Sequence, residues 1–147
     1  MIRSFVVVVA FAGSLFACGP LPSGSDSGTG GGGGTSGPIT CIAGQQCSCT
    51  TGNCTLNCPA TGGCQANCTG STCTMNCAGT DGCQLTCGSG ATCTQVCSGG
   101  SCELTGTSAT KTQQTCGSAS SCLSTCTGVA NCKQTSGSGT ANCTGCN

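Results

Sequence analysis

The sequence contains no histidine, no tryptophan and no tyrosine, and its three phenylalanines all precede Cys18. Histidine is the commonest general acid or base, and a Ser or Thr hydroxyl needs a neighbouring base before it becomes a nucleophile. We therefore expect no catalytic residue and no enzymatic activity. Sugar rings stack on exposed aromatic rings, so the lack of aromatic residues after Cys18 also argues against a surface of that kind for glycans.

Charged side chains are nearly as scarce, because Lys and Arg total three and Asp and Glu total three in 147 residues. Nucleic-acid binding needs clustered Lys and Arg to neutralise phosphates, so nucleic acid is not an expected partner. Asp81 precedes Gly82 in a turn-like pair, and Glu103 stands alone in a strand-like stretch. Neither carboxylate has the neighbours of a calcium-binding loop, and we expect no bound metal and no cofactor.

Cysteine and glycine, by contrast, are abundant, with 21 and 27 residues respectively. Large aliphatic side chains after Cys18 are too few for an ordinary apolar core, and small domains of this kind are usually held together by disulfides or metal. Cysteine at this density indicates a disulfide scaffold formed in an oxidising compartment.

The cysteines follow a repeat in which five-residue blocks begin and end with Cys and recur about every nine or ten residues. The regular blocks are Cys54–Cys58, Cys64–Cys68, Cys73–Cys77, Cys83–Cys87 and Cys93–Cys97, and the last block runs from Cys132 to Ser136. Period-two alternation places both cysteines and the middle residue of a block on one face of a β-strand. The Gly-rich turns come too close together for stable helices.

Two such strands with their turns make a coil of about 19 to 20 residues, which predicts an all-β fold, a flat disulfide-stapled β-solenoid with two short strands per coil. Equivalent residues of every second block then stack in rows on each outer face. One row holds Thr55, Thr74, Thr94, Gln113 and Lys133, and a row on the other face holds Gln65, Gln84, Glu103 and Leu123.

The pairing of the cysteines is argued from one irregularity in the repeat. The repeat predicts Cys at the end of one block and at the start of the next, but these two positions are occupied by Gly106 and Thr112. Their joint loss is expected if the last Cys of one block bonds to the first Cys of the next across the turn. A bond within a block fails, because four residues of strand separate the Cα atoms by about 13 Å and a disulfide needs less than about 7 Å. The predicted disulfides are Cys41–Cys47, Cys49–Cys54, Cys58–Cys64, Cys68–Cys73, Cys77–Cys83, Cys87–Cys93, Cys97–Cys102, Cys116–Cys122, Cys126–Cys132 and Cys143–Cys146. Bonds between stacked coils remain an alternative.

The N-terminal residues have the features of an export signal. Arg3 precedes an apolar run that is too short to span a bilayer and that ends in Leu15-Phe16-Ala17-Cys18. This ending resembles the bacterial lipobox. The resemblance implies that residues 1–17 are a lipoprotein signal peptide and that Cys18 carries diacylglycerol and an N-acyl chain such as palmitate. Gly19, in place of Asp, implies an outer-membrane location that faces the periplasm or the cell surface. A plain secretory signal is the alternative.

Residues 18–40 follow as a Gly- and Ser-rich stretch, which predicts a disordered tether. The expected domains are therefore the signal peptide at 1–17, the lipidated cysteine with its tether at 18–40, and the Cys-rich repeat domain at 41–147. The membrane, reached through the lipid anchor, is the expected partner. No feature of the sequence identifies a protein or glycan partner.

As a whole, the lipobox, the Gly/Ser tether and the Cys-x3-Cys repeats resemble small Cys-rich lipoproteins of myxobacteria and their relatives. The resemblance implies an exported, non-enzymatic surface lipoprotein with a structural or binding role, and it implies no particular activity. One alternative is a thiolate metal-binding protein, because cysteine suits soft metals. A second is the binding of ice or a glycan by the polar faces, since Thr72-Cys73-Thr74 and Thr92-Cys93-Thr94 resemble the repeated triplets of insect antifreeze solenoids.

Overall fold

The computed structural model describes residues 37–41, 43–79 and 81–147, so the predicted signal peptide, Cys18 and most of the predicted tether lie outside the described residues. This part of the chain forms β-strands and no helix. Accordingly, none of it is a helix long and apolar enough to cross a membrane. The strands are β1 (Gly37–Thr40), β2 (Gln46–Cys49), β3 (Asn53–Cys58), β4 (Cys64–Cys68), β5 (Thr72–Cys77), β6 (Cys83–Cys87), β7 (Thr92–Cys97), β8 (Ser101–Thr107), β9 (Lys111–Cys116), β10 (Ser121–Thr127), β11 (Cys132–Thr135) and β12 (Thr140–Thr144).

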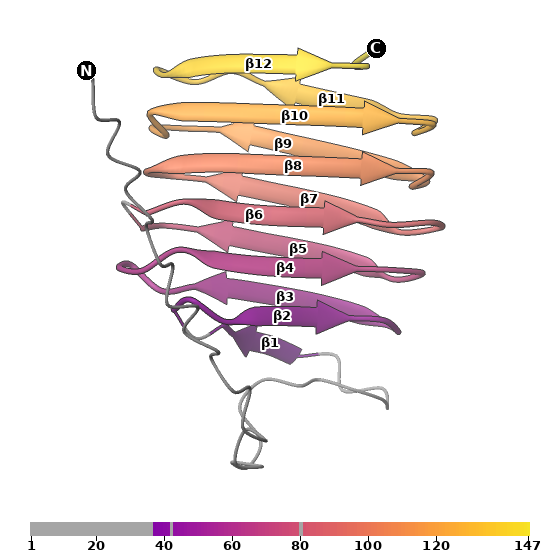
Figure 1. Ribbon diagram of the computed structural model, residues 1–147, viewed down its shortest axis with the longest axis horizontal. Helices are drawn as coiled ribbons and strands as arrows, with labels where there is room; N and C mark the ends of the chain where they lie inside the picture. Colours follow the sequence, from indigo (N-terminus) through magenta and orange to yellow (C-terminus); the bar gives the residue numbers. More distant parts are fainter. Residues whose placement is uncertain (1–36, 42, 80) are drawn as a thin grey trace, which may run out of the picture.

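Successive strands alternate between two six-stranded sheets, sheet A with the odd-numbered strands and sheet B with the even-numbered ones. All neighbouring strands within a sheet pair in parallel. Figure 1 shows them stacked in chain order from β1 and β2, in indigo, to β12, in yellow. Side chains that hydrogen-bond between neighbouring coils are 19 or 20 residues apart. The predicted flat β-solenoid with two strands per coil is therefore confirmed.

The strand register builds the two predicted outer rows. On sheet A, Thr55 aligns with Thr74 and Thr74 with Thr94. On sheet B, Gln65 aligns with Gln84, and Gln84 with Glu103. Parallel strands lie about 4.8 Å apart, so like side chains in a row are in contact range along the axis of the solenoid.

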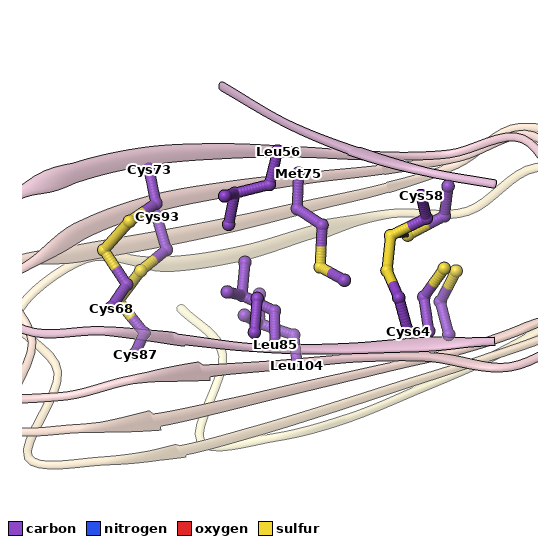
Figure 2. Packing of buried hydrophobic residues seen from close by; sticks show 14 of the residues in the cluster. Leu56, Cys58, Cys64, Cys68, Cys73, Met75, Leu85, Cys87, Cys93 and Leu104 are labelled. Atoms are coloured by element: carbon purple, nitrogen blue, oxygen red, sulfur yellow. Dashed lines mark hydrogen bonds between the residues drawn. A yellow bond between two sulfur atoms is a disulfide. The ribbon is translucent and has the colours of Figure 1, made fainter. Parts of the chain in front are cut away.

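Every second side chain points between the two sheets, and β4 and β6 alternate strictly between buried and exposed residues. In the middle of the interior, Leu56 and Met75 from sheet A and Leu85 and Leu104 from sheet B are fully buried. Figure 2 shows these four side chains facing one another, with cysteines on both sides of them. Cysteine sulfur thus fills both margins of the interior, and only a few large apolar side chains fill its centre.

Further along sheet A, the central inward position changes from apolar side chains to a ladder of three glutamines. The Nε2 atom of Gln114 donates to Oε1 of Gln95 at 2.7 Å, and Nε2 of Gln134 donates to Oε1 of Gln114 at 2.6 Å. Gln95 donates in turn to the backbone oxygen of Glu103 at 3.2 Å, and Gln114 to that of Leu123 at 3.2 Å. Among the described residues, no buried side-chain nitrogen or oxygen lacks a partner. The ladder therefore fills the interior without an unsatisfied polar atom.

The solenoid begins at Gly37, earlier than the expected boundary at Cys41. Strand β1 aligns Gly37 with Cys54 and Pro38 with Thr55 at the edge of sheet A. A proline is tolerated on an edge strand because its missing N–H costs no ladder hydrogen bond there. The Gly-Pro composition of this segment resembles a linker, and this is why the sequence pattern placed the boundary later.

Candidate functional site in the cysteine columns

The cysteines form two columns, one along each margin of the solenoid. Column 1 lies at the turns that lead from sheet B to sheet A. It contains the disulfides Cys49–Cys54, Cys68–Cys73, Cys87–Cys93 and Cys126–Cys132. Column 2 lies at the turns that lead from sheet A to sheet B. It contains Cys41–Cys47, Cys58–Cys64, Cys97–Cys102 and Cys116–Cys122. A further disulfide, Cys143–Cys146, joins a residue of β12 to the segment that follows this strand.

Each bond in the columns crosses one turn and joins residues five or six apart in sequence. The Cα atoms of bonded cysteines are 5.8 to 6.4 Å apart, within the usual range for disulfides. The structure thus joins these pairs as the repeat predicts, across turns and not within blocks. In the chain-entropy model each such short loop stabilises the fold by about 2 kcal/mol.

We call each pair of facing positions along a column a rung. Column 1 has one rung without sulfur, where Gly106 and Thr112 take the places of the two cysteines. A Cβ atom added to Gly106 would lie 2.8 Å from Cγ2 of Thr112 and 2.9 Å from Cγ2 of Val129. The Thr112 hydroxyl lies 3.1 Å from Sγ of Cys126, in the neighbouring rung. Gly106 and Thr112 therefore face each other, and small side chains occupy the space of the missing disulfide.

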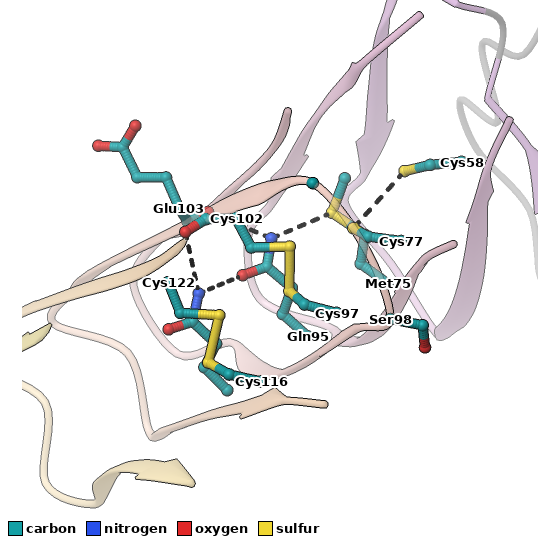
Figure 3. Close-up of a disulfide and its surroundings, with 12 residues drawn as sticks. Cys58, Met75, Cys77, Gln95, Cys97, Ser98, Cys102, Glu103, Cys116 and Cys122 are labelled. Carbon is teal, nitrogen blue, oxygen red and sulfur yellow. Dashed lines mark hydrogen bonds between the residues drawn. A yellow bond between two sulfur atoms is a disulfide. The ribbon is translucent and has the colours of Figure 1, made fainter. Parts of the chain in front are cut away.

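Column 2 has one rung with sulfur but no bond. Among the described residues, Cys77 and Cys83 are the cysteines with free thiols, and both are buried. This differs from the predicted disulfide, although Cys58 and Cys64 are bonded at the same separation of 6. Sγ of Cys77 lies 4.0 Å from Sγ of Cys58 in the adjacent rung, a contact that Figure 3 marks with a dashed line. The Cys77 and Cys83 side chains act on each other's pKa through a hydrogen bond.

The two thiols have opposite acidities because they share this hydrogen bond. It raises the pKa of Cys77, and burial in the interior adds to the increase. The same hydrogen bond lowers the pKa of Cys83 against the opposing effect of burial. Cys83 is therefore the member of the pair that more readily becomes a thiolate.

Four groups of three cysteines have sulfur atoms within 4.8 Å of one another, close enough to suggest metal binding. They are Cys49 with Cys68 and Cys73, Cys58 with Cys64 and Cys83, Cys77 with Cys83 and Cys102, and Cys132 with Cys143 and Cys146. The first and last groups consist of disulfide-bonded sulfurs, which have no thiolate to offer. The groups that include Cys83 differ, because they contain a free thiol.

The outer faces are polar and shallow. Nδ2 of Asn76 donates to Oδ1 of Asn57 at 2.9 Å on sheet A, and Nε2 of Gln84 donates to Oε2 of Glu103 at 3.1 Å on sheet B. The threonine row of sheet A ends after Thr94, because Gln113 follows in register. It is therefore a short row and not a continuous threonine array.

Two hollows lie on sheet B, along the margin where its strands begin. One, of about 260 Å³, is lined by Gly44, Gly63, Cys64, Gln65, Gly82 and Gln84. The other, of about 240 Å³, is lined by Gly82, Cys83, Gln84, Ser101, Cys102, Glu103, Ser121 and Leu123. The second hollow lies over the rung with the free thiols.

Sequence reasoning did not find two features of this site. The inward placement of Gln95, Gln114 and Gln134 follows from the repeat, but their mutual hydrogen bonds do not. The unbonded state of Cys77 and Cys83 has no signal in the spacing at all. The chain was also compared with known proteins, and no protein-family model, curated protein or solved structure matches it.

Proposed function

We propose that this chain is a non-enzymatic structural lipoprotein, a rigid rod that is exported and held on the outer membrane by a lipid at Cys18. The observation that supports this most directly is the interior, which is closed along both margins by disulfides across short turns. A structural role fits such a Cys-rich, disulfide-stapled solenoid.

The rigidity of the rod can be argued from its resistance to local opening. Proteolysis needs a segment to open locally, and the free energy of local opening is low only where few contacts hold the segment. Here disulfides close most of the turns, and each strand of the middle coils pairs on both sides within its sheet. The rod should therefore resist cleavage from β1 to β11 and be cleaved more readily near β12, where side chains are mostly exposed.

Attachment is the second half of the proposal and rests on the lipobox-like ending at Cys18. Several acyl chains on one residue hold a protein stably on a bilayer, at about 0.8 kcal/mol per buried methylene. The Gly-rich residues between the anchor and β1 would then act as a flexible tether. The polar rows of the two sheets would face outward, available to a partner.

The test uses the full chain in a bacterial host, with and without Cys18→Ala. We expect the unsubstituted protein to incorporate labelled palmitate and to fractionate with the outer membrane, and the variant to lose both properties. In the same fractions, protease should leave a core of residues from about β1 to β11 intact without reductant. Labelling that persists in the variant would overturn the anchor, and rapid cleavage between β3 and β10 would overturn the rigid rod.

A further inference from the structure

Column 2 contains a pair of soft donor atoms that the structural role does not use. Cys77 ends β5 and Cys83 begins β6, so their thiols face each other across one turn inside the solenoid. The rungs on either side are closed disulfides, Cys58–Cys64 and Cys97–Cys102. The pair is therefore enclosed by sulfur along the axis and by the two sheets across it.

The sulfur positions suit an ion between them. The Sγ atoms of Cys77, Cys83 and Cys102 all lie within 4.8 Å of one another. A bond from a thiolate to a filled-shell metal such as zinc is about 2.3 Å, so two such bonds in line span about 4.6 Å. Two thiolates that hold one such ion therefore need sulfur atoms separated by a distance close to the 4.8 Å limit within which these sulfurs lie.

The donor set indicates which class of ion would bind. Further sulfur lies close by, since Met75 is on the same inward face as Cys77 and both contact the Gln95 carboxamide, with its Nε2 atom 3.8 Å from Met75 Sδ. Figure 3 shows Met75, Gln95 and Cys77 in this part of the interior. Zinc requires four ligands and calcium requires several oxygens, and two thiolates satisfy neither requirement. Soft monovalent ions, by contrast, prefer thiolate and thioether sulfur.

An access route leads to the pair from the outside. Cys83 and Cys102 line the floor of the hollow of about 240 Å³ on sheet B, and Glu103 lines its wall. The Glu103 carboxylate gives the mouth of this hollow a negative charge, which attracts cations. Cys83 is buried but lines this hollow, so an ion that arrives there lies next to the residue whose sulfur it would bind.

From this geometry we propose that Cys77 and Cys83 form a binding site for one soft monovalent cation, Cu(I) or Ag(I), held in two-coordinate fashion between the sheets. On binding, each S–H bond releases its proton to water and two metal–sulfur bonds form, with no transfer of electrons. The site is separate from the structural role and departs from the sequence-based expectation that no cysteine holds a metal.

The first experiment counts thiols and needs no variant. The full chain is denatured without reductant, alkylated and mapped by peptide mass spectrometry, which distinguishes Cys77 and Cys83 from Cys18. We expect both thiols to be alkylated in the metal-free protein. Prior incubation with Ag(I) in nitrate buffer, or with Cu(I) kept reduced by ascorbate, should protect them under native alkylation. Isolated protein in which Cys77 and Cys83 are already joined by a disulfide would overturn the proposal.

The second experiment measures affinity against a chromophoric Cu(I) chelator. The unsubstituted protein should take one ion per chain, and Cys77→Ser or Cys83→Ser should weaken binding on the order of 100-fold or more, since one sulfur of two is lost. The matched control is the double variant Cys143→Ser with Cys146→Ser, which also removes two cysteines and should bind as the unsubstituted protein does. Glu103→Gln should slow loading and leave the stoichiometry unchanged. Equal binding by the two double variants, Cys77→Ser with Cys83→Ser and the control, would overturn the site.

Discussion

At the scale of single residues, the turns of column 1 each contain a residue with a positive φ. This residue is glycine in the other turns and serine at position 108. Gly70, Gly90 and Gly128 have φ values of 65°, 72° and 65°, and Ser108 has a φ of 53° in the same kind of turn. Its backbone N–H donates to Thr127, and its backbone oxygen accepts from Gly90, so the conformation is fixed by the stacked turns. A side chain in this left-handed region costs about 1 to 2 kcal/mol relative to glycine.

Replacing Ser108 by Gly should therefore raise the free energy of unfolding by about 1 kcal/mol, because the strain is removed and part of the gain is offset by the flexibility of glycine in the unfolded chain. The measurement is chemical denaturation without reductant. Gly90→Ala is the converse variant. Its added Cβ would have open space, with Gly70 Cα 3.9 Å away, so only the backbone conformation opposes it. It should lower the free energy of unfolding by a similar amount. A loss of stability in Ser108→Gly would contradict the argument.

At the scale of secondary-structure elements, the glutamine ladder is the part of the interior most sensitive to a single change. Gln114 lies in the middle, donating to Gln95 and accepting from Gln134. Gln114→Leu would leave the buried Gln95 oxygen and the partly buried Gln134 amide without these partners. Unpaired buried polar atoms cost about 1 to 3 kcal/mol each, so we expect a destabilisation of about 2 to 4 kcal/mol in chemical denaturation.

Gln134→Leu is the matched control, because it lies at the end of the ladder and is only partly buried. It removes the two hydrogen bonds that Gln134 donates, to Oε1 of Gln114 at 2.6 Å and to the backbone oxygen of Cys122 at 3.5 Å, at a position that solvent reaches in part. The expected loss is about 1 kcal/mol or less. Equal effects of the two substitutions would mean that the ladder is not a cooperative unit.

The strands, coil length and register were predictable from the sequence because period-two alternation and the Gly-rich turns both repeat throughout the block region. The same regularity predicted the disulfides across turns, through the joint absence of cysteine at Gly106 and Thr112. The repeat could not predict the state of Cys77 and Cys83. Spacing along the chain carries no information on that state, since Cys58 and Cys64 are bonded at the same separation of 6. The start at Gly37 was missed because its composition is that of a linker.

At the scale of the whole molecule, disulfides take the place of a large apolar core. Each short loop contributes about 2 kcal/mol, and the bonds together contribute more than the 5 to 15 kcal/mol by which most domains are stable. Reduction should therefore unfold the repeat domain at room temperature. We expect the β-type circular dichroism spectrum to be lost on addition of a phosphine reductant and to be retained on heating without it. A reduced chain that keeps its spectrum would show that the strand ladders and the glutamines suffice.

Because the solenoid is a stack of equivalent coils, we expect deletion of one whole coil to be tolerated better than deletion of a single residue. Cys83 and Cys102 occupy equivalent register positions, and the side chains that follow them, Gln84 and Glu103, are 19 residues apart. Deletion of residues 83–101 therefore removes one complete coil and places β8 on β4, with Cys102 opposite Cys77. Because each coil contacts mainly its neighbours, the shortened rod should fold and lose only the contribution of one coil, about 2 to 4 kcal/mol.

Deletion of Met75 alone is the contrasting variant. Removing one residue from the middle of β5 reverses the facing of the residues that follow, so that Asn76 would point inward and Cys77 outward. We expect this variant to lose the protease-resistant core, whereas the chain that lacks a whole coil keeps it in the same digestion without reductant. If both deletions were equally tolerated, the interior would not depend on strand register. If both variants lost the protease-resistant core, the coils would act as one indivisible domain and not as a stack of repeats.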